Sequence, residues 1–305
     1  MGITIKGIAR ILNVSHTTVS RSLNDSPLIS QETKERVKEV ARPYNYKPNV
    51  NARSLVTSKS YNLGLFFSSL KSGTTANFFL DTVKGVNSQI KGKYNLAVEA
   101  IDDLEDVENI RPRYFDGILF MSQNEADDEI ISHVVNQKIP VVVMNRESEG
   151  RKLTTILADD LAGAYEVTKL IIQNGHKRLG IIEGKQEFRT SQKRKQGFLK
   201  ALSEANLVHD GTLAIPGNYD VASGYRAMKQ LLSLNEKPTA VFCSNDEMAL
   251  GAMKAIAEEG YSVPGDFSIA GFDDMGFTAY LSPALTTVKR PIEEIAKRGS
   301  RLLLD

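Results

Sequence analysis

Cysteine, histidine and long apolar runs are scarce in this chain of 305 residues. The single cysteine, Cys243, excludes an intrachain disulfide and any metal site built from several thiolates. Only four histidines are present, without paired ligand spacing, so neither a metal nor another cofactor is expected. No apolar run approaches the length of a membrane span, and the first residues lack the apolar core of a signal peptide. These absences predict a cytoplasmic protein with no membrane partner.

The net charge of +1 conceals an uneven distribution of charge along the chain. Residues 1–60 hold ten Lys or Arg and four Asp or Glu, a net charge of +6. The remainder holds 28 and 33, a net charge of −5. A small basic segment followed by a larger, mildly acidic one is typical of a polyanion-binding domain joined to a sensor domain. The chain is long enough for a small domain and a larger two-lobed one.

The basic module shows the pattern of three short helices. An apolar face at helical spacing follows Thr4, a potential N-cap, and consists of Ile5, Ile8, Ala9 and Leu12. After a turn at 13–15, Ser15 can cap a second helix with Val19 and Leu23 facing inward. The side chains left outward on that helix are His16, Thr17, Ser20 and Arg21. A third helix is expected from Ser30 to Pro43. Two short helices joined by a tight turn are typical of a helix-turn-helix, although a generic three-helix bundle with a basic surface is the alternative.

The same segment resembles the lactose/galactose repressor family of transcription regulators. The matching stretches are residues 4–6, 14–15, 18–24, 30–33, 46–49 and 52–55. The resemblance implies that His16 and Thr17 select the operator in double-stranded DNA and that Arg21 reads an adjacent base. Arginine can donate two parallel hydrogen bonds to O6 and N7 of guanine, whereas hydroxyl groups bind phosphates. The implied DNA-binding residues are Thr4, Ser15, His16, Thr17, Ser20, Arg21, Asn24, Ser30, Thr33, Tyr46, Asn49, Ala52 and Leu55.

Residues 48–60 are expected to form a hinge between a DNA-binding domain at 1–47 and an effector-binding and dimerisation domain at 61–305. Residues 48–57 are too few for a stable isolated helix, so a plain linker is one interpretation. The resemblance implies instead that the hinge folds on DNA, pairs with its mate in a homodimer and inserts Leu55 into the minor groove.

From residue 62 onward, apolar runs alternate with amphipathic segments. The runs 63–67, 117–121, 141–144, 179–182, 239–243 and 267–271 indicate buried parallel strands. Amphipathic segments such as 162–173, 195–205 and 247–259 lie between them. This alternation predicts an α/β domain with doubly wound parallel sheets, which bind ligands at the carboxyl ends of their strands. Cys243 ends one of these runs, so we expect it to be buried and not a nucleophile.

Motifs for nucleotide binding and catalysis are missing from the larger domain. The sequence contains no Gly-x-Gly-x-x-Gly, and residues 180–185 have the wrong glycine spacing for a P-loop. No nucleophile and base are suggested together, so no catalytic residue is assigned and the chain is not expected to be an enzyme.

The family resemblance continues through residues 61–305, which look like a periplasmic sugar-binding protein. It rests on residues 77–79, 116–118, 175–178, 194, 197–198, 223–225, 244–251 and 271–274. It implies an N-lobe at 61–158 and 291–305, a C-lobe at 159–290 and a small-molecule effector between them. The implied ligand-binding residues are Phe78, Thr190, Arg194, Tyr219, Asn245 and Asp273. An aromatic face with polar groups around it suits a sugar, whose hydroxyls are costly to bury unpaired.

These residues also have structural interpretations. Asn245 and Asp273 follow apolar strands, where Asn and Asp often cap helices or form turns. Asp246 is the expected N-cap of a helix that begins at Met248. Arg194 could belong to a solvated basic run, and Tyr219 could be surface packing.

Residues 102–115 form a shorter stretch than in most relatives, which predicts a reduced helix there.

The sequence therefore favours a repressor of sugar catabolism genes that releases DNA when a sugar binds. One alternative is a global carbon regulator that docks a phosphocarrier protein, since residues 237–240 and 246–251 resemble that subgroup. At Glu293 and Glu294, however, that subgroup has a Tyr-Asp pair. Because of this mismatch, the global carbon regulator is the second hypothesis. A nucleobase-responsive repressor is another alternative. A transport-type binding protein is disfavoured by the missing signal peptide and by the expected DNA-binding domain at 1–47.

Overall fold

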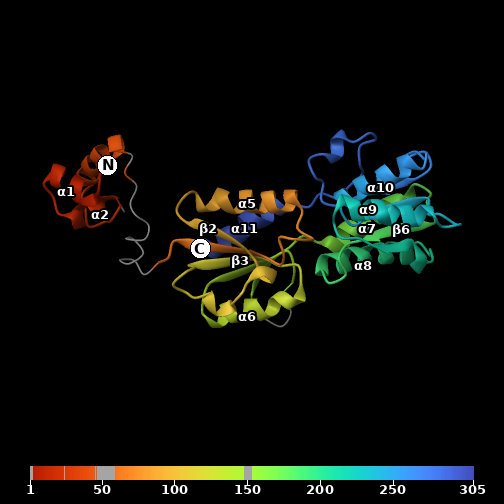
Figure 1. Cartoon of the computed structure of the whole chain (residues 1–305), viewed down its shortest axis with the longest axis horizontal. Coiled ribbons are helices and arrows are strands. Elements are labelled where there is room, and N and C mark those ends of the chain that lie inside the picture. The colour runs from red at the N-terminus through yellow and green to blue at the C-terminus, as the bar shows by residue number, and fades with distance from the viewer. Residues whose placement is uncertain (1–2, 24, 45, 47–58, 148–152) are drawn as a thin grey trace. The chain divides into compact units, whose positions relative to one another are not determined.

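The computed structural model describes residues 3–23, 25–44, 46, 59–147 and 153–305. The chain divides into two compact units, Met1–Tyr61 and Asn62–Asp305 (Figure 1). The predicted DNA-binding residues Asn24, Asn49, Ala52 and Leu55 lie outside the described residues, as does most of the predicted hinge.

Within its described residues, the first unit has three short helices around a small apolar core. These helices are α1 (Ile5–Leu12), α2 (His16–Leu23) and α3 (Gln31–Ala41), and a 3-10 turn, η1 (Arg42–Tyr44), follows. The caps predicted at Thr4 and Ser15 are confirmed, because their side chains accept hydrogen bonds from backbone N–H groups three residues further on. Ser30 caps α3 in the same way. The core is formed by Ile8, Ala9, Val19, Val37 and Ala41. Its helices are too short to be stable alone, so this core holds the unit together.

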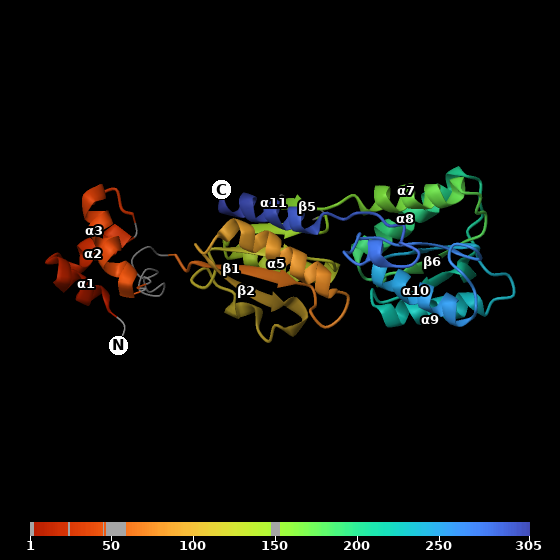
Figure 2. The same ribbon diagram turned by 90° about the horizontal axis from the view of Figure 1, so that it is seen from above.

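The N-lobe of the second unit is a five-stranded parallel sheet with helices on both faces. Its strands are β1 (Asn62–Phe67), β2 (Asn95–Ala100), β3 (Gly117–Met121), β4 (Val141–Met144) and β5 (Thr154–Ile156), in the order β2-β1-β3-β4-β5. The helices α5 (Ala76–Ile90) and α11 (Ile292–Leu304) lie side by side on one face (Figure 2), and α6 (Asp128–Asn136) covers the other. Parallel strands buried on both faces explain the nearly continuous apolar runs.

The C-lobe repeats this plan with a four-stranded parallel sheet in the order β7-β6-β8-β9. Its strands are β6 (Leu179–Glu183), β7 (Ala214–Pro216), β8 (Ala240–Cys243) and β9 (Ser268–Ala270). Helices α7 (Asp160–Gln173) and α8 (Arg189–Glu204) pack on one face, and α9 (Val221–Leu232) and α10 (Asp246–Glu258) pack on the other. The predicted α/β class with two doubly wound parallel sheets is confirmed.

Helices α9 and α10 meet at two glycines. A Cβ atom at Gly224 would overlap the backbone of Met248, and a Cβ atom at Gly251 would overlap the backbone of Val221. Each helix therefore offers a notch to the backbone of the other, and the two can pack more closely than side chains would allow. This close pairing forms one face of the C-lobe core.

The chain crosses between the lobes at residues 157–159 and returns at residues 289–291. Between β2 and β3 the chain forms only the 3-10 turns η2 (Ile101–Asp103) and η3 (Val107–Asn109), which confirms the predicted reduction of a helix. Asp160 follows the first crossing as the first residue of α7, and Arg290 lies within the second crossing.

Candidate functional site

Polar side chains follow the carboxyl ends of strands in both lobes. Gln123 follows β3 and Asn145 follows β4, while Asn245 follows β8 and Asp273 follows β9. Since these strands are parallel within each sheet, their carboxyl ends meet at one edge, where ligands of such sheets bind. The two edges face each other across a small cavity.

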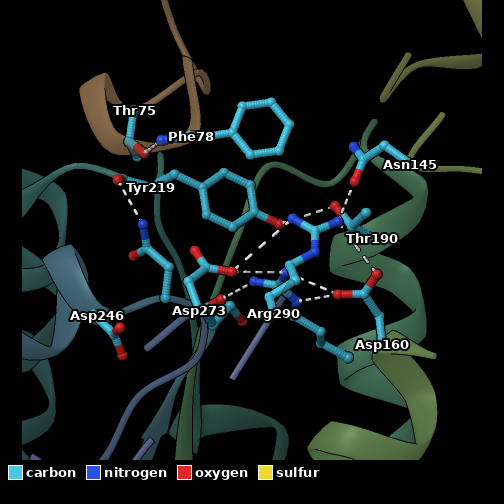
Figure 3. Close-up of polar contacts among 12 residues, drawn as sticks. Thr75, Phe78, Asn145, Asp160, Thr190, Tyr219, Asp246, Asp273 and Arg290 are labelled. Atoms are coloured by element: carbon cyan, nitrogen blue, oxygen red, sulfur yellow. Dashed lines mark hydrogen bonds and ion pairs between the residues drawn. The ribbon is translucent and has the colours of Figure 1, made fainter. Parts of the chain in front are cut away.

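All six ligand-binding residues predicted from the sequence line this one cavity. Its walls are formed by Gly73, Thr75, Phe78, Gln123, Thr190, Arg194, Tyr219, Asn245, Asp273 and Arg290. The empty space between these walls, open solvent included, is about 280 Å³. Figure 3 shows that the side chains come from both lobes, with Phe78 and Thr75 opposite Tyr219 and Thr190.

Arg194 is at the centre of a buried ionic cluster and is only 1% exposed, which excludes the solvated-run interpretation. Its Nε donates to Asp160 Oδ1 over 2.8 Å, and its Nη2 lies 3.2 Å from Asp273 Oδ1. Its Nη1 donates to the carbonyl oxygen of Ser244, and the guanidinium stacks on the Phe272 ring at 3.8 Å. Burial by itself would lower the pKa of Arg194, but the carboxylates of Asp160 and Asp273 outweigh it and hold that pKa above its usual value.

Asp160 connects the two arginines of the cluster. Besides Arg194, its Oδ2 lies 3.4 Å from Arg290 Nη2, and its side chain is only 4% exposed. Arg290 Nη2 also donates to Asn145 Oδ1 in the N-lobe. Because Asp160 and Arg290 stand at the two crossings, this pair ties the crossings to each other.

Asp273 faces the cavity with an 18% exposed side chain and a left-handed backbone, with φ at 108°. Burial raises the pKa of Asp273 above its usual value, although Arg194 and Arg290 oppose this shift. The backbone of this residue is held by Val288, whose carbonyl accepts from its N–H over 2.8 Å. A carboxylate held in this way can accept hydrogen bonds from ligand hydroxyls.

Aromatic rings form the apolar side of the cavity. The Tyr219 ring stacks on Phe188 with centroids 6.0 Å apart, and its hydroxyl lies 3.5 Å from Thr190 Oγ1. Tyr219 is buried, which excludes surface packing, and the Phe78 ring stands across the cavity near Arg290. Rings in the wall can pack on the apolar faces of a sugar ring, and the charged groups beside them can bind its hydroxyls.

The sequence-based assignment of Asp246 as an N-cap is wrong. Asn245 is the N-cap, with its Oδ1 accepting from Met248 N–H over 2.9 Å, and α10 begins at Asp246. Asn245 Nδ2 also donates to the Tyr219 carbonyl, which positions the aromatic wall. Asp246 instead accepts from Met275 N–H and Thr287 Oγ1, and burial raises its pKa to about 7. The carboxyl group thereby anchors the loop that carries Asp273.

Sequence reasoning missed four residues of the cavity wall, Gly73, Thr75, Gln123 and Arg290, and Asp160 behind the wall. Gln123 follows a predicted strand, so its place at the carboxyl end of β3 was a signal that could have identified it. Arg290 and Asp160 lie in short crossing segments without periodicity, and only the tertiary structure brings them together.

On the first unit, the residues predicted to select the operator form an exposed edge of α2. His16, Thr17 and Arg21 are exposed, whereas Val19 on the opposite side is fully buried. Tyr46, also predicted to contact DNA, packs partly against the core of this unit. The hydroxyls predicted to hold phosphates include the caps Ser15 and Ser30, which lie at helix N-termini, where backbone N–H groups favour anions.

Neither a metal site nor a membrane span is found in the part of the chain that the structure describes. No group of three or more His, Cys, Asp or Glu side chains is arranged to hold an ion there. No described helix is both long enough and apolar enough to cross a bilayer. Cys243 is buried as predicted, and burial raises the pKa of its thiol.

Both units match known proteins. Residues 4–49 match the family described as bacterial regulatory proteins, lacI family, and residues 168–305 match the periplasmic binding protein-like domain. Over 302 residues the chain is 49% identical to the probable HTH-type transcriptional repressor ExuR of Bacillus subtilis (strain 168), covering 99% of this chain and 91% of the relative. The lac repressor dimer bound to operator and the anti-inducer ONPF superposes with a TM-score of 0.85 at 25% identity, covering 100% and 92% of the two chains. A complex of the transcriptional regulator CelR with cellobiose gives 0.74 at 26% identity, covering 99% and 92%.

Proposed function

Because this chain belongs to the lacI family of bacterial regulatory proteins, we propose that it is a homodimeric repressor that binds a roughly palindromic operator and is released by a sugar. The observation that supports the effector most strongly is the convergence of the six implied side chains on one cavity between the lobes. The lac repressor dimer bound to operator supports the mode of DNA binding by similarity. Two-fold symmetry of a dimer is mirrored in two half-sites of DNA.

For DNA reading, we propose that α2 lies in the major groove with His16, Thr17 and Arg21 toward the bases. These side chains are exposed on one edge of α2, while Val19 anchors the opposite edge in the core. Ser15, Ser20, Ser30 and Thr33 then hold phosphates, which fix the register of the helix without reading sequence.

Arg21→Ala is expected to weaken operator binding by about 1–3 kcal/mol and to relax base preference at one position in each half-site, because the guanidinium fork is lost. The measurement is fluorescence anisotropy with the operator, a set of single-base variants and random DNA. Arg298→Ala removes the same charge from an exposed position in α11 and serves as the control. Equal losses on operator and random DNA would assign Arg21 to phosphate contact instead.

For the effector, we propose that the sugar lies between the Tyr219 and Phe78 rings and donates hydroxyl hydrogens to Asp273. The ligand shifts the equilibrium between operator-binding and released conformations only by its difference in affinity for the two, typically 1–3 kcal/mol. Both crossings adjoin the cavity, through Asp160 and Arg290, so a ligand there can change the angle between the lobes.

Asp273→Asn is expected to leave operator binding within about twofold of the parent and to weaken the response to effector about tenfold or more, since one hydrogen bond to a charged group is worth about 1.5–3 kcal/mol. The measurement is operator release as a function of sugar concentration. Asp274→Asn is the matched control, because Asp274 also has a positive φ but is exposed. A folded Asp273→Asn variant with unchanged ligand affinity in calorimetry would remove Asp273 from the site.

A further inference from the structure

The two lobes also contact each other at a place that belongs to neither crossing. The N–H of Arg189, the first residue of α8, donates to the carbonyl oxygen of Gln123 in the N-lobe over 3.1 Å. Beside them, Asn124 and Phe188 form an isolated antiparallel bridge. The first N–H groups of a helix need acceptors from outside it, and the side chain of Phe188 supplies none. The N-lobe therefore completes the first turn of a helix that belongs to the C-lobe.

The side chain of Phe188 contacts both lobes and is only 3% exposed. Its ring stacks on Tyr219 in the C-lobe. In the N-lobe the ring lies against Gly73, where a Cβ atom would be 2.5 Å from Cε2 of the ring. Gly73 also has a φ of 82°, in the left-handed region that favours glycine. The backbone at Gly73 is therefore shaped to receive this ring.

Polar contacts join the same two parts of the lobes. Lys185 Nζ donates to Ser72 Oγ over 2.7 Å, and the Lys185 side chain is only 18% exposed. Arg189 pairs with Glu125 over 2.5 Å, but this pair is more exposed and contributes less. All of these contacts start from residues 185–189, between the end of β6 and the first residue of α8. One short segment of the C-lobe thus binds two loops of the N-lobe.

We propose that residues 185–189 are a latch that holds the lobes in the operator-binding arrangement, and that the effector acts by releasing this latch. The inference rests on the proposed function, in which the protein binds the operator until a sugar binds. The latch contacts are all made within the protein, so they stabilise an arrangement that needs no ligand. A ligand shifts an equilibrium only by its difference in affinity, so a sugar that releases the operator must bind better to unlatched lobes. Tyr219 connects the two sites, because it lines the effector cavity and stacks on Phe188.

The first test is a disulfide across the latch, formed in the full chain with Asn124→Cys and Phe188→Cys and with oxidised glutathione as the oxidant. Facing residues of an antiparallel pair have Cα atoms about 4.5–5.5 Å apart, which a disulfide can span. Cys243 is buried and its thiol pKa is raised, so it does not compete, and each single-cysteine variant is the control. We expect the pair to close about fivefold faster on the operator than on random DNA, measured by non-reducing electrophoresis. Equal rates on the two DNAs would overturn the latch.

The second test compares the oxidised and reduced forms of the same variant in operator binding, with ribose, cellobiose and glucuronate as probes. We expect the oxidised form to bind the operator within about twofold of the reduced form and to stay bound at sugar concentrations that release the reduced form. An oxidised form that has lost the operator, or that a sugar releases as readily, would contradict the proposal. If neither these sugars nor a wider panel releases the parent protein, the proposed function fails, while the closing rates on the two DNAs still decide the latch.

Lys185→Met separates the latch from folding. Methionine keeps an apolar side chain beside the Phe188 position but cannot donate to Ser72. Added to the cysteine pair, it should slow disulfide closure about threefold and leave the unfolding temperature nearly unchanged, because both lobe cores remain intact. Lys254→Met, which removes a lysine from an exposed ion pair in α10, is the control and should change neither. A structural role for Lys185 would give the reverse, a lower unfolding temperature with an unchanged closing rate.

Discussion

Asp160→Ala is expected to lower the free energy of unfolding by about 3–5 kcal/mol, one of the two largest effects of a single substitution that we predict. Asp160 is 4% exposed and is the nearest carboxylate to both Arg194 and Arg290. Removing it leaves two buried guanidinium groups with incomplete compensation, and breaking a buried ion pair from one side typically costs this much. The remaining carboxylate, Asp273, is farther from Arg290.

The measurement for Asp160→Ala is urea unfolding followed by far-UV circular dichroism, since the chain has no tryptophan to report by fluorescence. Asp103→Ala is the control, because Asp103 forms an exposed ion pair with Lys71. Exposed pairs contribute about 0–1 kcal/mol, so the control should unfold almost as the parent does. Similar losses for the two variants would show that the buried cluster contributes no more than a surface pair.

Gly224→Val is expected to destabilise the C-lobe by about 3 kcal/mol, at the upper end for overpacking. Any side chain at this position meets the backbone of Met248 in α10, which cannot rotate away as a flexible side chain could. The two helices must separate, and the apolar contacts between α9 and α10 are lost along their length. The same reasoning applies to Gly251 on the opposite helix.

The control for Gly224→Val is Gly211→Ala, since a Cβ atom at Gly211 meets nothing within 4 Å. Both variants are followed by thermal unfolding and by operator binding. We expect Gly211→Ala to unfold near the temperature of the parent and Gly224→Val well below it. An unchanged unfolding temperature for Gly224→Val would mean that α9 and α10 can move apart without loss of packing.

The strands that could be predicted from the sequence are those with buried apolar runs. The six predicted runs became β1, β3, β4, β6, β8 and β9. β2, β5 and β7 were not predicted, and each lies at an edge of its sheet with a pattern of exposed and half-buried residues. These three are covered less than β9, the edge strand that was predicted and whose Ile269 and Ala270 are buried, so their sequences carry a weaker apolar signal.

The candidate site was predictable where a residue type followed a recognisable strand or motif. Asp273 and Asn245 follow apolar runs, and the family resemblance identified Arg194, which immediately precedes the predicted amphipathic segment 195–205. The ionic partners were not predictable, because Asp160 and Arg290 are 130 positions apart and meet only when both crossings are formed. The N-cap of α10 was misplaced by one residue, since Asn and Asp are similar caps and the sequence does not show that Asp246 binds Met275 and Thr287 instead.

The N-lobe core is assembled from segments at opposite ends of the second unit. Ile292, Ile295 and Ala296 of α11 pack with Leu63 and Leu65 of β1, although the entire C-lobe lies between them in the sequence. Domains tend to fold as units while the chain is being synthesised. The C-lobe core runs without interruption from α7 to Leu285 beyond β9, so it is synthesised in full before α11. The lobe whose synthesis starts first therefore cannot complete its core until α11, which follows the whole C-lobe, is available.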